Sequence, residues 1–318
     1  MNKNDNLLAY VAELYYERGL SQKEIGAIIG VSRPTVSRFI EEAKAQGIVK
    51  IIIETPISNN VKLSNKLRKT FSLRDAIVVS ADFDFDKSIE ICSKVTASIL
   101  CSYLQNNMTL GITWGRSINS VATSLEECPF ENVHIAQMTG CMKVSGDNSA
   151  DGYAITQTFA RKLHATYSPI NAPLLVKGKE VYNFLISEPL IKEGLEKAKK
   201  LDIAIVGTSP FDDVGDPIHR SGYFNSYSLG KDKSSKPVAS VSGHFLDIDG
   251  NEITFDNIYS IAAPLSVIKK APISILLNAT AQRAEATMAV LNAKLVNILI
   301  VDENHAKRLL DIKEQFKK

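Results

Sequence analysis

The sequence has few cysteines, no long apolar run and almost no excess of charge. Its four cysteines are spread over 318 residues without a C-x-x-C spacing, a pattern that argues against a disulfide scaffold and against a zinc site. No run approaches the roughly 18 apolar residues that cross a membrane. The first residues mix apolar side chains with Glu and Tyr, and they lack the small-residue cleavage site of a signal peptide. We therefore expect a cytoplasmic protein without a metal or a cofactor.

The charge does not by itself indicate a nucleic-acid partner, because the net charge is only +2. Residues 1–55 contain seven Lys or Arg and seven Asp or Glu. Any attraction of this part of the chain to DNA must therefore come from where its cations are placed, and from several copies acting together.

Residues 20–46, LSQKEIGAIIGVSRPTVSRFIEEAKAQ, predict two short helices joined by a tight turn. Ser21 and Glu24 have the spacing of a capping box, in which each side chain accepts a hydrogen bond from the other residue's backbone amide. Gly30 suits the left-handed position that follows a helix, and Ser32 is expected to cap the next one. This is the pattern of a helix-turn-helix unit that binds DNA.

The second of these helices carries the DNA-binding prediction. Its apolar positions recur at helical spacing and are expected to face a core; they are Val36, Phe39, Ile40 and Ala43. The opposite face carries short hydroxyl side chains and arginines, which bind phosphates and base edges in the major groove. The predicted DNA contacts are Ser21, Gln22, Ser32, Arg33, Pro34, Thr35, Ser37, Arg38 and Lys44. The alternative is a helical hairpin with a solvated face, which the balanced charge of residues 1–55 would favour.

The chain predicts a small first domain, a connector and a large α/β domain. A helix over residues 5–18 would complete the first domain, residues 1–55, and residues 48–54 would add a strand or wing. Residues 56–72 would form a linker and a connecting or dimerising helix. In residues 73–318, helices alternate with strands predicted at residues 76–80, 109–114, 133–138, 174–176, 203–206, 238–245, 273–277 and 296–301. This alternation, with continuously apolar runs such as AIVVS and NILIV, predicts a doubly wound parallel sheet.

Ligands of such sheets bind beyond the carboxyl ends of the strands, so the turns that follow predicted strands form the candidate effector site. The turn at residues 111–117 combines glycines, hydroxyl groups and a cation at a helix N-terminus, which suits a phosphate or a polyol. The turns at residues 139–140 and 207–209 would add further walls, although each turn could also be a plain connection. The predicted effector residues of these turns are Gly111, Thr113, Trp114, Gly115, Arg116, Ser117, Thr139, Gly140, Gly207, Thr208 and Ser209.

Acidic residues offer fewer candidates. Asp247 is the better candidate for holding sugar hydroxyls, because Asp249 precedes Gly250 and suits a hairpin turn. Asp302 is expected to cap the last helix. One loop could hold a metal, although a solvated Gly/Pro loop explains its composition; its residues are Asp212, Asp213, Asp216 and His219. No Ser-His-Asp or Cys-His arrangement emerges.

Six segments, taken in order, resemble the SorC family of bacterial sugar-responsive regulators over essentially the whole chain. They are SQKEIGAIIGVSRPTVSRFIEEAKAQGIV, LGITWGRSI, DIAIVGTS, IHRSGY, FLDIDG and NILIVDENHAKRLL. The resemblance implies an effector domain related to phosphosugar isomerases and deaminases, assembly as a homotetramer or a dimer of dimers, and operator binding that a sugar phosphate or related metabolite alters. By position, it also places the effector site at residues 111–117, at residues 207–209 and at Asp247.

The sequence departs from the family between the last two strands. Members usually carry a glycine pair there, with a lysine shortly after. Here Ala279 and Thr280 stand at the glycine positions, and Arg283 stands at the lysine position. Side chains in the turn would narrow a backbone cradle, and arginine keeps the charge of lysine but not its geometry. We therefore expect an altered turn in which Arg283 binds the effector.

The leading hypothesis is a sugar-responsive transcriptional regulator of a carbohydrate or polyol operon, which binds double-stranded operator DNA as a dimer or tetramer. The alternative is an enzyme, a phosphosugar isomerase or deaminase with a fused N-terminal module. Such chemistry needs a general base near a sugar carbon. Asp247 is the only candidate base, and no partner acid accompanies it, so we predict that the protein is not an enzyme.

Overall fold

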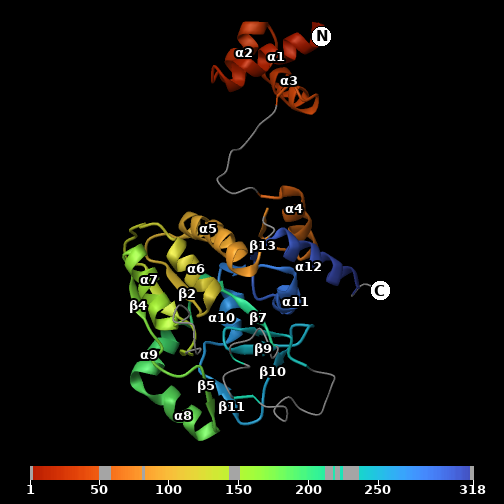
Figure 1. Cartoon of the computed structure of the whole chain (residues 1–318). Helices are drawn as coiled ribbons and strands as arrows, with labels where there is room; N and C mark the ends of the chain where they lie inside the picture. The colour runs from red at the N-terminus through yellow and green to blue at the C-terminus, as the bar shows by residue number, and fades with distance from the viewer. Residues whose placement is uncertain are drawn as a thin grey trace. The chain divides into compact units, whose positions relative to one another are not determined.

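The computed structural model describes residues 3–49, 59–80, 83–142, 151–211 and 236–315, together with residues 218, 223 and 224. The chain folds as two compact units, Met1–Pro56 and Ile57–Lys318, which are described separately here (Figure 1). None of the described helices is both long and apolar enough to cross a membrane.

The smaller unit contains three helices, α1 (Lys3–Tyr16), α2 (Gln22–Ile29) and α3 (Arg33–Ala45). Buried side chains from all three helices form its core, among them Leu14, Ile25 and Val36. The predicted capping box is confirmed: Glu24 Oε2 accepts from the Ser21 backbone nitrogen at 2.8 Å, and Ser21 Oγ accepts from the Glu24 backbone nitrogen at 3.3 Å. Gly30 ends α2 in the left-handed conformation, with φ of 72°. The unit is therefore a helix-turn-helix fold, and its first helix lies two residues earlier at each end than the predicted 5–18.

Two predictions for the smaller unit differ from the structure, the cap at Ser32 and the strand from residue 48. Ser32 precedes α3, but its hydroxyl does not cap the helix. It lies 2.9 Å from the hydroxyl of Thr35 instead, so the two short side chains satisfy each other. Ile48 and Val49 form a bend rather than the start of a strand. The rest of the predicted wing, residues 50–54, lies outside the described residues.

A parallel seven-stranded sheet forms the centre of the larger unit. Its order is β1-β13-β12-β6-β2-β3-β4, and every neighbouring pair is parallel. The strands are β1 (Asp75–Val79), β2 (Thr109–Ile112), β3 (His134–Gln137), β4 (Thr166–Ser168), β6 (Ile203–Val206), β12 (Ile273–Leu277) and β13 (Ile298–Asp302). The chain runs outward from β2 through β3 and β4, and outward from β6 through β12 and β13. The junction between β2 and β6 is therefore the topological switch point, where ligands of such folds bind.

Helices cover both faces of this sheet, which explains the continuously apolar strands. One apolar core lies under α5 (Phe85–Tyr103), α6 (Arg116–Ser124) and α7 (Gly152–Leu163). The other lies under α4 (Val61–Thr70), α10 (Leu265–Lys270), α11 (Ala284–Asn292) and α12 (Glu303–Gln315). The predicted doubly wound α/β fold is thus confirmed.

Smaller elements complete the larger unit, and several were not predicted because they are too short to show a period. A second sheet has the order β10-β9-β8-β7, and β5 pairs with β11. These strands are β5 (Leu175–Lys177), β7 (Thr208–Pro210), β8 (Ala239–Val241), β9 (His244–Leu246), β10 (Glu252–Ile253) and β11 (Ile258–Ser260). The helices α8 (Lys179–Ser187) and α9 (Pro189–Lys197) follow β5 as expected. The single strand predicted at residues 238–245 is wrong, because Ser242 and Gly243 adopt φ of 51° and 79° and turn the chain between β8 and β9.

The helix that was expected as a connector, α4, is part of the larger unit. Leu67 is fully buried in the core on that face of the sheet. Ser64 Oγ accepts a hydrogen bond of 2.9 Å from the backbone nitrogen of Val78 in β1. The helix therefore joins the sheet by packing and by hydrogen bonding.

Candidate DNA-binding surface and effector site

The N-terminal half of α3 presents most of the predicted DNA contacts to solvent. Ser21, Ser32, Arg33, Pro34, Arg38 and Lys44 are exposed, and Gln22, Thr35 and Ser37 are half-buried. Arg33 and Arg38 form no ion pair with another described residue. Lys44 pairs with Glu41 at 3.2 Å, and the hydrogen bond that its ammonium group donates to that carboxylate raises the pKa of Lys44. Two arginines thus remain available for DNA, whereas the charge of Lys44 is already balanced.

The loop after β2 lies beside the loop after β6 at the switch point. A Cβ on Gly207 would lie 3.6 Å from the Cβ of Ser117, so the two loops touch. Gly115 adopts φ of 116°, and no side chain caps α6 behind it. The first backbone N–H groups of α6 are therefore not bonded to a side-chain cap, and they can donate hydrogen bonds to an anion.

Two buried hydroxyl groups lie at neighbouring strand ends close to this loop. Thr113 follows β2, Thr139 follows β3, and both residues are almost completely buried. Neither hydroxyl has a hydrogen-bond partner within the described part of the chain. A buried hydroxyl without a partner costs free energy, and both of these groups are covered by the protein rather than exposed to a ligand.

Two guanidinium groups converge on the ring of Phe85, the first residue of α5. Arg283 Cζ lies 3.9 Å from the ring centroid, and Arg116 Cζ lies 4.9 Å from it. Arg116 also pairs with Asp86 at 3.0 Å. The two cations come from turns that are about 170 residues apart in the chain (283 − 116 = 167), so only the fold places them at one aromatic ring. Both guanidinium groups therefore lie near the first residue of α6, where Asp86 balances the charge of Arg116.

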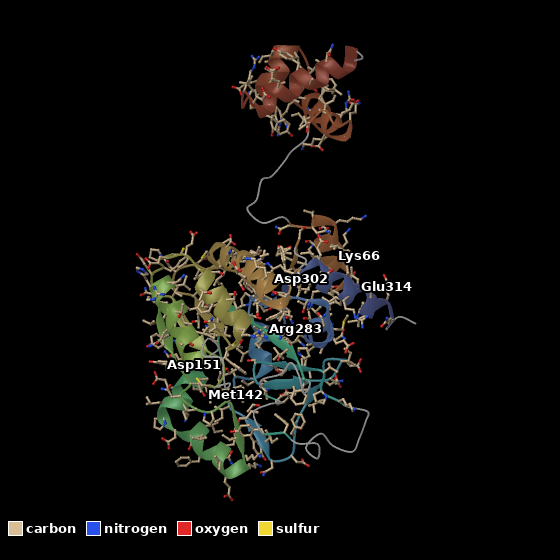
Figure 2. The ribbon with its side chains drawn as sticks, in the orientation of Figure 1. Lys66, Met142, Asp151, Arg283, Asp302 and Glu314 are labelled. Atoms are coloured by element: carbon tan, nitrogen blue, oxygen red, sulfur yellow. The ribbon has the colours of Figure 1, made fainter. Side chains whose placement is uncertain are left out.

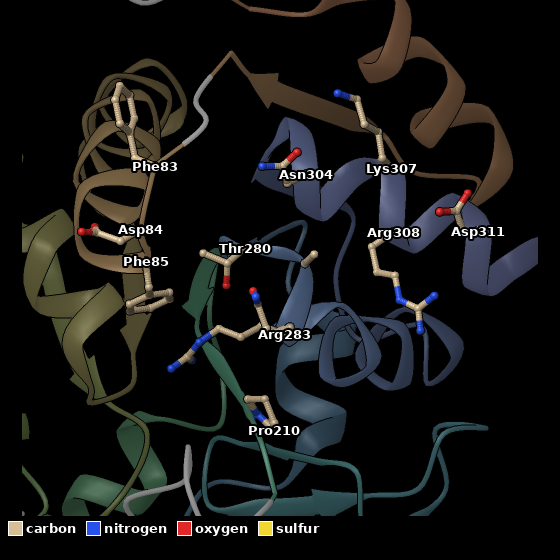
Figure 3. A pocket seen from close by; sticks show the side chains of 12 residues that line it. Phe83, Asp84, Phe85, Pro210, Thr280, Arg283, Asn304, Lys307, Arg308 and Asp311 are labelled. Carbon is tan, nitrogen blue, oxygen red and sulfur yellow. The ribbon is translucent and has the colours of Figure 1, made fainter.

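A cavity of about 840 Å³ is lined by both Arg283 and Phe85 (Figure 3). Its walls come from the start of α5, from β7, from the turn after β12 and from α12. The lining residues are Phe83, Asp84, Phe85, Pro210, Thr280, Ala281, Gln282, Arg283, Asn304, Lys307, Arg308 and Asp311. Arg283 reaches from one wall toward Phe85, while Lys307 and Arg308 come from α12 on another. Most of these residues were not predicted, because exposed positions of a surface helix carry no local sign of a cavity.

The turn after β12 keeps a glycine-like backbone although it contains no glycine. Thr280 has φ of 66° and ψ of 145°, a conformation that favours glycine. Asp302 Oδ2 accepts from its backbone nitrogen at 2.6 Å, and the Thr280 carbonyl accepts from His305 Nδ1 at 2.8 Å. Thr280 therefore occupies a backbone conformation that favours glycine, and the side chains of Thr280 and Arg283 both form part of the cavity wall.

His305 is fully buried beneath this turn. Burial disfavours its charged form and lowers its pKa to about 4, although the nearby Asp302 opposes that shift. Its Nε2 has no partner among the described residues. Asp302 Oδ1 accepts from the His305 backbone nitrogen at 2.8 Å, so the predicted capping role of Asp302 is confirmed.

Two of the predicted cradle glycines have packing roles instead. A Cβ on Gly111 would lie 2.3 Å from Leu201 Cδ1, and one on Gly140 would lie 2.6 Å from the carbonyl oxygen of Pro173. Both positions are glycines because neighbouring atoms fill the space of a side chain. Trp114 is half-buried and packs in an apolar cluster that includes Met142, which is labelled in Figure 2.

The hydroxyls after β6 are engaged within the protein. Thr208 Oγ1 donates to the Ser240 carbonyl at 2.8 Å, and the Ser209 and Ser240 hydroxyls lie 2.9 Å apart. They hold β7 against β8, so their contribution to the site is to position the Gly207 backbone.

Asp247 does not join the effector loops, which corrects its expected placement. Its carboxylate accepts from the backbone and side-chain nitrogens of Asn251 at 2.8 and 3.0 Å, and so closes the β9–β10 hairpin. A Cβ on Gly250 of this hairpin would lie 2.3 Å from the backbone nitrogen of Ala293. The hairpin therefore lies at the C-terminal end of α11, whereas the turn with Arg283 lies at the N-terminal end of that helix. Asp247, rather than the expected Asp249, therefore forms the side-chain hydrogen bonds that stabilise the hairpin turn.

No group of three potential metal ligands occurs among the described residues. The loop proposed as a metal site, with Asp212, Asp213, Asp216 and His219, lies outside the described residues.

Comparisons with known proteins agree on both units. The family model of the sugar-binding domain ("Sugar-bind") matches residues 55–311, and the model of sigma-70 region 4 matches residues 11–45. The chain is 26% identical to the uncharacterized transcriptional regulator YjhU of Escherichia coli, over 96% of this chain and 95% of that protein. It is 25% identical to the deoxyribonucleoside regulator of Bacillus subtilis, over 94% and 96% of the two chains. The crystal structure of the full-length sorbitol operon regulator SorC of Klebsiella pneumoniae has the same fold, with a TM-score of 0.70, 21% identity, and coverage of 97% of this chain and 100% of that one.

Proposed function

The chain belongs to the SorC family of sugar-binding transcriptional regulators, and we propose that an anionic sugar or polyol, such as a sugar phosphate, controls its binding to operator DNA. The effector would bind at the carboxyl ends of β2, β6 and β12. Its anionic group would lie at the free N-terminus of α6, between Arg116 and Arg283.

The observation that carries the effector proposal is the convergence of Arg116 and Arg283 on Phe85. Asp86 balances the charge of Arg116 in the absence of a ligand, and an anion at the start of α6 would be a further partner for both guanidinium groups. The relatives named for sorbitol and for deoxyribonucleosides are consistent with hydroxyl-rich ligands.

Operator binding would use α3 from at least two copies of the chain. A single small unit has as many acidic as basic residues in positions 1–55, so one copy offers little attraction to phosphate. Paired recognition helices enter major grooves one helical turn or a multiple of it apart, which predicts a near-palindromic operator. We therefore propose a dimer or a tetramer as the binding species.

We propose that the effector is bound without turnover. The residue considered as a general base, Asp247, is held by Asn251 in a hairpin at the far end of α11. A carboxylate that is fixed in a turn away from the ligand cannot take a proton from it.

A gel-shift titration on the DNA upstream of the protein's own gene tests the proposed function. The titration is repeated with a panel of sugars, polyols and their phosphates. We expect a shifted complex whose affinity changes with a phosphorylated member of the panel. No shifted complex, or steady turnover of a sugar phosphate, would overturn the proposal.

A further inference from the structure

Glu303 is the first residue of α12. Its carboxylate contacts both a residue that lines the cavity and a residue at the start of the larger unit. Its Oε2 lies 3.3 Å from Nζ of Lys307, which lines the cavity. Its Oε1 accepts hydrogen bonds of 3.0 Å from Asn60 Nδ2 and from Ser80 Oγ. These hydrogen bonds, that of Asn60 first, lower the pKa of Glu303, so the group is ionised near neutral pH.

Asn60 fixes the chain to the sheet at the point where it enters the larger unit from the smaller one. Its backbone nitrogen donates to the Val78 carbonyl at 2.7 Å. Its Oδ1 accepts from the Leu63 backbone nitrogen at 3.1 Å and so caps α4. A change in the position of Asn60 would therefore weaken the attachment of α4 to β1 at the start of the larger unit.

We propose that Glu303 transmits occupancy of the effector cavity to Asn60, and that this contact sets operator affinity. The inference rests on the proposed function. A polar or anionic group of the effector that reaches the Lys307 wall of the cavity competes with Glu303 for the ammonium group of Lys307. Once Lys307 turns to this group, Oε2 of Glu303 loses its cation, and only the hydrogen bonds from Asn60 and Ser80 to Oε1 still hold the carboxylate. The carboxylate is then less firmly fixed, and the anchor at Asn60 loosens with it.

The substitution Asn60→Asp tests the contact without any effector. Aspartate caps a helix as well as asparagine does, so α4 should keep its cap. The hydrogen bond to Glu303 is replaced by repulsion between two carboxylates, which imitates the loosened anchor. We expect the operator Kd of the effector-free full-length protein to change by about fivefold or more, with a circular dichroism spectrum like that of the wild type. Lys307→Met, which removes the cation from Glu303, should shift the Kd in the same direction.

A charge exchange and a matched control make the test specific. In the double variant Asn60→Asp with Glu303→Gln, the amide can donate to the new carboxylate, and the wild-type Kd should return. Lys66→Met breaks the exposed Lys66–Glu314 pair, 3.8 Å long, between the same two helices but away from the cavity (Figure 2). It should leave the Kd unchanged.

The inference is overturned if Asn60→Asp binds the operator like wild type, or if the double variant is not restored. It is also overturned if Lys66→Met has the same effect as Asn60→Asp. Failure of the wild-type protein to bind the operator at all would instead overturn the proposed function, so the two failures are distinguishable.

Discussion

Asp302 holds Thr280 in a backbone conformation that glycine usually occupies, through a hydrogen bond of 2.6 Å from the Thr280 backbone nitrogen to Oδ2. The same carboxylate caps α12 through the His305 backbone nitrogen. One buried side chain thus fixes both the turn after β12 and the start of the last helix. The turn carries Arg283 and the helix carries Lys307, so this contact sets the distance between two walls of the cavity.

Relief of the strain at Thr280 should be measurable. We expect Thr280→Gly to be more stable than Thr280→Ala by about 1 kcal/mol, because any Cβ is disfavoured at φ of 66° whereas glycine is not. Urea unfolding of the two variants gives the difference in the free energy of unfolding. Equal stability of the two variants would show that the surrounding contacts, and not the backbone, determine the cost.

The buried His305 should make the fold sensitive to acid. Its pKa of about 4 in the folded protein is below the ordinary value of 6.5, so between these values the unfolded chain binds a proton that the folded chain does not. Its effect on stability is absent above about pH 6.5 and grows to a loss of about 3 kcal/mol as the pH falls to 4. Urea unfolding at pH 7.5 and 5.0 measures the loss. His305→Asn should flatten the dependence, whereas a change at the exposed His164 should leave it as in wild type.

Gly140 and Gly111 should differ in their tolerance of a methyl group. A Cβ on Gly140 would meet carbonyl oxygens of Ala172 and Pro173 at 2.7 and 2.6 Å, and backbone atoms cannot rotate away. At Gly111 the closest atom belongs to the flexible Leu201 side chain. We expect Gly140→Ala to lower the free energy of unfolding by about 3 kcal/mol or more, and Gly111→Ala by about 1–3 kcal/mol. The reverse order in thermal unfolding would contradict the packing roles of these glycines.

Replacement of the two free arginines of α3 should weaken operator binding. Arg33→Ala with Arg38→Ala removes two phosphate or base contacts, so the slope of log affinity against log salt should fall by about 2 for each bound copy. The specific affinity should drop by at least about tenfold. Lys44→Ala is the matched control, and its effect should be smaller because Glu41 already balances that charge. Unchanged binding by the double variant would exclude this face of α3 as the DNA-reading surface.

Arg283 should distinguish phosphorylated from neutral ligands. We expect Arg283→Met to weaken binding of the phosphorylated members of the panel by about tenfold or more, because a charge-assisted contact is lost, and to leave free polyols nearly unaffected. Isothermal titration calorimetry measures both classes. Arg74→Met is the control. Arg74 also lies over an aromatic ring, with its Cζ 5.4 Å from the ring centroid of Tyr103. It precedes β1, however, and so lies at the amino ends of the strands, away from the proposed site at their carboxyl ends. Equal loss for both ligand classes would exclude a specific role in anion binding.

Local features of the chain could be predicted because they depend on neighbours in sequence. The capping box of Ser21 and Glu24 and the left-handed Gly30 involve residues within a few positions of one another. The apolar strand β12 was predicted with its observed bounds, since strand length and composition are also local properties. Short strands such as β4 and β7 lack enough residues to show a period, and so they were missed.

The sequence by itself therefore determined the helix-turn-helix unit, the parallel α/β fold and the turns that could bind a ligand. Only the tertiary structure decided which residues meet at those turns. It brought Arg116 and Arg283 to one phenylalanine, and it took Asp247 to the far end of α11. The physical reason is that a residue's type and its neighbours set its local conformation, whereas its contacts depend on how strands distant in sequence are ordered in the sheet.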